Sequence, residues 1–144
     1  MINGAFALAA KAHPVEGKWS ALEVLCHLVD ADLTISHRIR AALVVDGPRL
    51  PAFSREVLTT ILTPDARDLD EELALFGLIR KQTARVLKAS PAGTLDRTVI
   101  LVKNDGDEVT RPIRQVITSI TQHIGHHLGF VEEKRRALGL VASH

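Results

Sequence analysis

Cysteine, aromatic residues and excess charge are nearly absent from this 144-residue sequence. With Cys26 as the only cysteine, no intrachain disulfide can form. Tyr is missing and aromatic residues make up only 3%, which argues against a base-stacking surface for single-stranded nucleic acid. Since 18 basic residues stand against 17 acidic ones, the net charge of +1 gives no electrostatic reason to bind nucleic acid or an anionic membrane.

Long apolar runs are also missing. None approaches the roughly 20 residues that span a bilayer, and the first residues lack the basic region, apolar core and cleavage site of a secretory leader. We therefore expect a soluble cytoplasmic protein with no nucleic-acid or membrane partner. The length fits a single domain over residues 1–144.

Most of the sequence has helical periodicity. A short first helix is predicted over residues 3–12, before a His-Pro pair. A second helix begins after Ser20, where Glu23 completes a capping box, and it stops at the Asp-Gly-Pro run of residues 46–48. A connector over residues 49–63 follows, with one short helix expected over residues 54–62.

The second half of the sequence predicts two further helices with a hairpin between them. The third helix is expected from Thr63-Pro64 to about Ser90, with a buried face that contains Leu69, Leu73, Phe76, Ile79 and Leu87. Residues 98–102 and 108–110 predict two short strands around an Asn-Asp-Gly turn. The fourth helix is expected from near Pro112 to Leu138-Gly139, with Gly139 as its C-terminal cap.

These elements favour an all-α class, a four-helix bundle with a short β-hairpin before the last helix. The first predicted helix is too short to cover the full length of the others, each of which needs its apolar stripe buried. An uncovered stripe on a soluble protein is commonly a contact surface. We therefore expect a homodimer.

Two histidines of the last predicted helix face its apolar side. His123 and His127 are four residues apart, which places both imidazoles on one helix face, one turn apart. With His123 set at zero and about 100° per residue, His127 falls at about 40° and His126 near about 300°. His126 should therefore point away. Apolar residues occupy the arc from about 20° to about 140°, namely Val116, Ile120, Ile113, Val131, Ile124, Ile117 and Leu128.

A third imidazole, from His27 in the second predicted helix, would complete a three-nitrogen metal site with open positions for water or substrate. Two neutral imidazoles facing a core cost free energy unless each finds a partner, and a metal would supply one for each. On spacing alone, a solvated or hydrogen-bonded structural role remains the alternative. Sequence distance cannot show that the second and fourth helices touch at His27.

Two motifs resemble those of the DinB-like, YfiT-like superfamily of metal-dependent hydrolases. The first is residues 17–30, Gly-Lys-Trp-Ser-Ala-Leu-Glu-Val-Leu-Cys-His-Leu-Val-Asp, and the second is the His-Ile-Gly-His-His run of residues 123–127, followed by residues 134–139. The resemblance covers nearly the whole chain in order. It implies dimers built through bundle helices and a divalent metal, commonly zinc or nickel, bound by His27, His123 and His127. The short first helix departs from the family, in which that helix is usually long.

The resemblance also implies a small metal-dependent enzyme. Its metal would lower the pKa of water for hydrolysis, or hold a thiolate for transfer or isomerisation. The substrate would be a small molecule, and a low-molecular-weight thiol would take part in the second reaction. The alternative is a non-enzymatic, stress-related helical dimer with a structural or vestigial metal site. An open coordination position beside a pocket would favour the enzyme.

The remaining polar residues are weaker candidates. Asp30, one turn after His27, could orient its imidazole or act as a base, although such an Asp is more often solvated. Cys26 projects about 100° away from His27 and is expected to be a small core residue. Arg38 and Arg40 are expected at the surface, where one of them could bind an anionic substrate at the pocket mouth.

Two further groups of charged residues have no expected role in the site. His13, His37 and His144 have no pattern that points to one and are expected in solvent. The run Lys134-Arg135-Arg136 lies at the predicted C-terminus of the last helix, where positive charge interacts favourably with the helix dipole.

Overall fold

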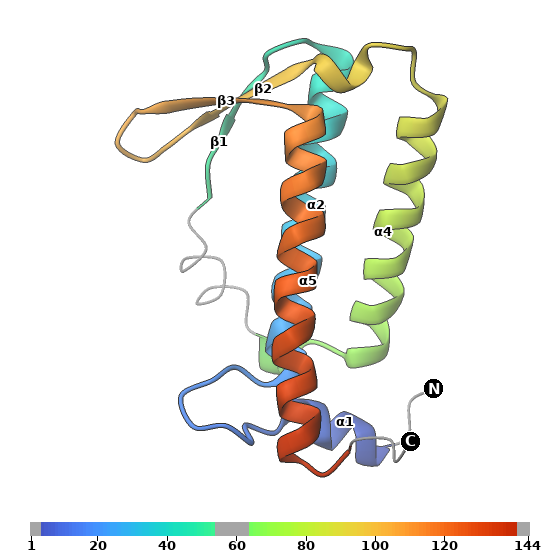
Figure 1. Cartoon of the computed structure of the whole chain (residues 1–144), viewed down its shortest axis with the longest axis vertical. Helices are drawn as coiled ribbons and strands as arrows, with labels where there is room; N and C mark the ends of the chain where they lie inside the picture. The colour runs from blue at the N-terminus through green and yellow to red at the C-terminus, as the bar shows by residue number, and fades with distance from the viewer. Residues whose placement is uncertain (1–3, 54–63, 141–144) are drawn as a thin grey trace.

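The computed structural model describes residues 4–53 and 64–140 (Figure 1). Within these residues it contains four α-helices and a three-stranded sheet. The helices are α1 (Gly4–Lys11), α2 (Ala21–Val44), α4 (Leu69–Ala89) and α5 (Ile113–Ala137). The predicted helical class with a hairpin before the last helix is confirmed. The short helix predicted over residues 54–62 lies outside the described residues.

The two longest helices, α2 and α5, pack side by side and run in opposite directions (Figure 1). Next to the sheet their apolar stripes meet in a core of fully or nearly fully buried side chains, Ile39, Ala42, Val99, Ile113 and Val116. Farther along α5 the buried positions are Ile120, His127 and Lys134. The buried face of α5 therefore changes from apolar to polar as it leaves the sheet, and the histidines lie in this polar half.

The basic run Lys134-Arg135-Arg136 lies in the last turn of α5, as predicted. Lys134 is nevertheless only 3% exposed, and its ammonium donates a hydrogen bond to the Phe130 carbonyl at 3.1 Å. Burial lowers the pKa of Lys134. Arg135 and Arg136 are exposed.

The sheet has one more strand than predicted. The predicted hairpin is present as β2 (Thr98–Val102) and β3 (Glu108–Pro112), which pair antiparallel. The additional strand, β1 (Arg49–Pro51), lies in the predicted connector and pairs parallel with β2. Its three residues are too few for a periodic pattern, and the pairing depends on β2, which is distant in sequence. β1 leads the chain away from the end of α2, to one side of the two long helices (Figure 1).

α4 begins later than predicted. Residues Pro64–Ala66 form a separate 3₁₀ turn, η1. The carboxylate of Asp68 then accepts hydrogen bonds from the backbone N–H groups of Asp70, at 2.9 Å, and Glu71, at 3.1 Å. This cap satisfies amide groups of the first turn, so the helix begins at Leu69 rather than at Thr63-Pro64.

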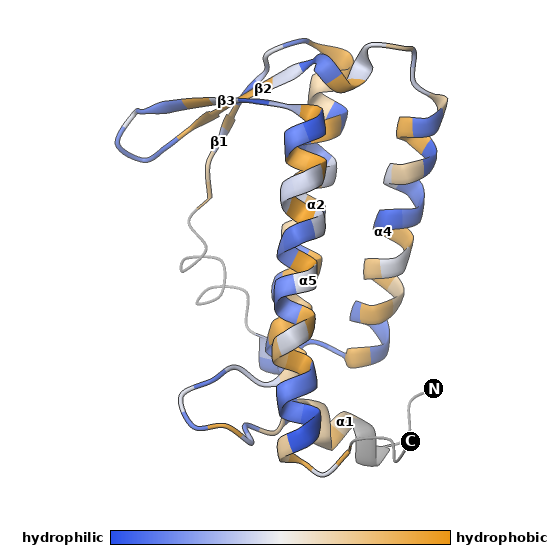
Figure 2. Cartoon of the chain, in the orientation of Figure 1, coloured by the Kyte–Doolittle hydropathy of each residue, from blue (hydrophilic) through white to orange (hydrophobic). Residues whose placement is uncertain are grey.

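α4 packs less closely than the sequence predicted. It contacts α2 through polar pairs, including Ser36 with Thr83 at 2.9 Å, and a groove of about 390 Å³ separates its apolar residues from α5. Leu73, predicted to be buried, is 44% exposed, and Leu128 of α5, also predicted to face the core, is 57% exposed. Figure 2 shows α4 with mixed polar and apolar residues and α1 confined to one end of the molecule.

No helix of residues 4–53 and 64–140 combines the length and the apolar composition needed to cross a membrane.

Candidate metal centre

His27 is positioned by the start of α2. The Ser20 hydroxyl accepts a hydrogen bond from the Glu23 backbone N–H at 3.1 Å, and the Glu23 carboxylate accepts one from the Ser20 backbone N–H. This is the predicted capping box, and it fixes the first turn of α2. His27 follows one turn later and is 5% exposed. The same Glu23 carboxylate lies 2.8 Å from the His13 ring, so His13 is engaged with Glu23 rather than only solvated.

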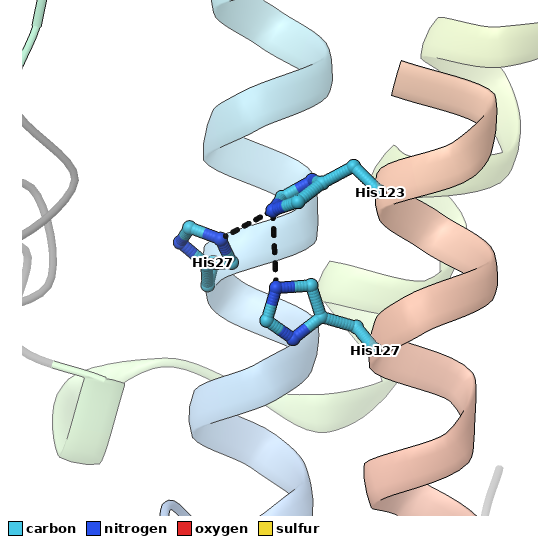
Figure 3. A group of neighbouring side chains, drawn as sticks. All are labelled: His27, His123 and His127. Carbon is cyan, nitrogen blue, oxygen red and sulfur yellow. Dashed lines mark hydrogen bonds between the residues drawn. The ribbon is translucent and has the colours of Figure 1, made fainter. Parts of the chain in front are cut away.

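α2 and α5 bring the three predicted histidines together (Figure 3). The Nε2 atom of His123 lies 3.1 Å from Nε2 of His27 and 3.0 Å from Nε2 of His127. His27 and His127 are buried, at 5% exposure each, and His123 is half-buried. The contact of the two helices at His27, which sequence distance left open, is therefore present.

The donor set fits a metal ion. Three imidazole nitrogens bound at about 2.0–2.1 Å to a tetrahedral metal would be about 3.3 Å apart, close to the separations found here. In a neutral imidazole, Nε2 carries either a hydrogen or a lone pair. Three Nε2 atoms that meet at one point therefore cannot all be hydrogen-bonded to one another. A cation at that point would accept a lone pair from each of the three nitrogens. Within residues 4–53 and 64–140, the cluster contains no fourth His, Cys, Asp or Glu.

Two aromatic neighbours shape the cluster. The Trp19 ring stacks nearly parallel to the ring of His127, at an interplanar angle of 3° and a centroid distance of 6.3 Å, and lies 5.3 Å from the ring of His27. The pattern of residues around Trp19 gave no sign that its ring contacts these histidines. His126 is exposed and lies outside the cluster, as its position on the helical wheel predicted, with its ring against Phe130.

Asp30 is held by an arginine that the sequence analysis did not single out. Its carboxylate accepts a hydrogen bond from Arg67 Nη1 at 2.8 Å, and Arg67 Nε donates to Glu72 at 2.9 Å. The hydrogen bonds to Glu72 and Asp30 raise the pKa of Arg67 despite its burial. Asp30 is therefore half-buried and ion-paired rather than solvated. No local pattern in the sequence joins positions 30, 67 and 72, because the pairing depends on how η1 folds against α2.

Cys26 lies beside His27 in sequence but outside the cluster. It is 4% exposed, and burial raises the pKa of its thiol to about 11. A thiol in this state is a poor nucleophile and a poor ligand, in agreement with the predicted role as a small core residue.

Cavities adjoin the histidine cluster. One, of about 230 Å³, is lined by His27 and His123 and extends along α2 to Arg38. Another, of about 300 Å³, lies beside His127 and contains Trp19 and Lys134. Arg40 turns instead to α4, where it donates to Gln82 at 3.0 Å. His37 is exposed as expected, and His144 lies outside the described residues.

The comparisons with known proteins agree with this architecture. The family model described as the DinB superfamily matches residues 9–131, which include all three histidines. Among solved structures, YfiT from Bacillus subtilis aligns with a TM-score of 0.77 at 16% sequence identity, over 97% of this chain and 77% of that chain. YfiT is described as "a probable metal-dependent hydrolase with an unusual four-helix bundle topology"; at this identity the likeness shows the fold alone. No curated protein matches the sequence. Because the family model covers most of its length, the chain belongs to the DinB superfamily.

Proposed function

We propose that His27, His123 and His127 bind a divalent metal, zinc or nickel, and that the protein is a metal-dependent hydrolase of small molecules. The observation that carries the proposal is the convergence of three Nε2 atoms from two helices on one point. Three histidines leave a position open in a four-coordinate site, which is typical of catalytic rather than structural metal sites. The metal would lower the pKa of water or hold a thiolate at that position.

The surrounding residues have distinct roles in this proposal. The three imidazoles hold the cation, and the capping box and the α2–α5 seam keep them in place. The Trp19 indole covers one side of the histidines and limits the access of water there. The cavity beside His27 and His123 admits the substrate. Asp30, one turn from His27, would act by positioning rather than as a free base, since its charge is already paired with Arg67.

A thiol-dependent transferase is the second candidate, supported by the same open position, since zinc and nickel sites bind thiolates well. A non-enzymatic helical dimer with a structural metal is the remaining alternative. The cavity that reaches two of the three histidines favours an enzyme, because a structural site is usually closed.

A substrate panel separates these functions. Protein purified without a histidine tag would be loaded with zinc or nickel and assayed with small esters, and then with an electrophile and low-molecular-weight thiols. We expect metal-dependent turnover that His127→Ala abolishes and His126→Ala retains. Turnover only in the presence of thiol would identify the transferase. A protein that binds metal tightly but turns over neither class would support the structural role.

A further inference from the structure

The cavity beside His27 and His123 has a positive charge at its far end. Its volume is about 230 Å³, and the positions that line it on α2 are His27, Ala31, Thr34, Ile35 and Arg38. Positions 27, 31, 34 and 38 follow one another at steps of four, three and four residues, which places them on one face of the helix. The cavity therefore follows α2 from the histidine cluster to Arg38. Phe53, Ser119 and Ile120 complete its walls.

Arg38 is half-buried and has no carboxylate partner in the part of the chain that the structure describes. Among the described residues its only hydrogen bond is to the Pro51 carbonyl, at 3.3 Å, and no acidic side chain there lies within ion-pair distance. Burial lowers the pKa of the guanidinium. Other arginines that face the helix seams have partners: Arg67 pairs with Asp30, and Arg80 pairs with Asp32. Arg38 therefore has unused N–H donors, in a fork that matches a carboxylate.

We propose that the substrate is a small, mainly apolar molecule with a carboxylate that binds Arg38 while its other end reaches the histidine cluster. This inference rests on the proposed function and adds the substrate class. Arg38 would contact the substrate and select for the acid. The apolar walls formed by Ala31, Ile35 and Ile120 suit the hydrocarbon between the two ends.

The cavity beside His127 is less suited to an anion. Its two lysines already have partners in the structure. Lys134 donates to the Phe130 carbonyl, and Lys18 lies 3.9 Å from the Glu133 carboxylate. That cavity also reaches His127 alone of the three clustered histidines.

Helix geometry sets the length of the ligand. Arg38 is three turns beyond His27, so their Cα atoms are about 16 Å apart at about 1.5 Å per residue. Helical side chains lean toward the N-terminus, which brings the Arg38 guanidinium closer to the cluster. A ligand with adjacent metal-binding and acidic groups would be too short to join the two ends. One with several methylene groups between them would fit.

The test uses probes that carry a thiol for the metal at one end. Calorimetric titration of the zinc-loaded, tag-free full chain would compare mercapto-carboxylates of increasing chain length with mercapto-alcohols of the same lengths. At the fitting length we expect the carboxylate to bind about tenfold more tightly or better, as for a charge-assisted hydrogen bond. Arg38→Gln should remove this preference and leave the affinity for the alcohol unchanged, because Gln keeps a donor for the Pro51 carbonyl but no charge.

Two variants complete the experiment. Arg40→Gln, on the same helix but facing α4, should keep the preference for the carboxylate. Arg38→Lys should keep part of it, and this variant also serves if Arg38→Gln does not fold. Equal affinity for acid and alcohol in the wild type would overturn this inference but not the proposed function. The same would follow if Lys18→Gln lost the preference for the carboxylate and Arg38→Gln kept it. Failure of zinc-loaded protein to bind either probe would overturn the proposed function with it.

Discussion

Replacing Arg67 by Met should destabilise the protein strongly, because two carboxylates depend on this one guanidinium. Arg67 Nη1 lies 2.8 Å from Asp30 Oδ2, and Arg67 Nε lies 2.9 Å from Glu72 Oε1. The side chains of Arg67, Asp30 and Glu72 are 18%, 15% and 10% exposed. The group joins η1 and the start of α4 to α2, one turn from His27.

The size of the effect follows from burial. Removing one partner of a buried ion pair costs about 3–5 kcal/mol, because the remaining charge is left uncompensated. Residual exposure lets water screen the two carboxylates, so we expect the lower end, about 3 kcal/mol. At roughly 2–4 °C per kcal/mol for a chain of this size, the melting temperature should fall by roughly 6–12 °C.

Urea unfolding followed by circular dichroism measures this change. Adding Glu72→Gln to Arg67→Met should recover part of the loss, since one of the two unpaired carboxylates is then removed. Arg85→Met, at an exposed position of α4, is the matched control and should be nearly neutral. A loss below about 1 kcal/mol for Arg67→Met would refute the reasoning, because it would place the triad among solvated surface pairs.

Four further outcomes are expected. Ser20→Ala should cost about 1 kcal/mol by removing the N-cap. Burial raises the pKa of Glu23, but the hydrogen bonds from Ser20 and the contact with His13 outweigh burial, and the net effect lowers this pKa. The stabilisation by Glu23 should therefore be lost as the pH falls through the lowered value. Between neutral and acid pH, the free energy of unfolding should change less in Glu23→Gln than in the wild type, and an equal change in the two proteins would contradict this. Cys26 should resist alkylation in the folded protein and react in denaturant; rapid reaction of the folded protein would be inconsistent with its burial. Light scattering should give twice the 15.7 kDa monomer mass, and a monomeric wild type would contradict the homodimer. Leu78 of α4 is an exposed apolar residue, and Leu78→Lys should weaken the dimer.

The candidate site was largely predictable because it depends on local rules. The spacing of four residues between His123 and His127 and the apolar arc around His127 selected the pair that the structure brings together with His27, and set His126 aside. The capping box located the start of α2 and therefore the turn that carries His27. Only the meeting of the two helices needed information beyond local spacing, and the family resemblance supplied it.

The burial of Lys134 agrees with the same helical wheel. Lys134 is eleven residues after His123, which places it at about 20° on the wheel, the same angle as Val116. This position lies at the edge of the apolar arc, and the side chain is buried. Lysine can bury its stem along an apolar face while its ammonium finds a carbonyl.

The other differences arise from tertiary structure. The parallel pairing of β1 with β2 joins segments about 50 residues apart, as in Leu50 with Leu101, and no local pattern reports such a pair. The exposure of Leu73 and Leu128 depends on which neighbouring elements cover α4 and α5, and a helical wheel does not report this. The isolation of Arg38 from every acidic side chain in the described part of the chain is equally invisible in the sequence.

Zinc or nickel titration of tag-free protein tests the central claim most directly. Calorimetry should show one metal ion per chain for the wild type and for His126→Ala. His27→Ala, His123→Ala and His127→Ala should each lose tight binding, because each removes one of the three converging Nε2 ligands. No binding by the wild type, or equal losses from His126→Ala and the other three variants, would contradict the three-histidine metal centre.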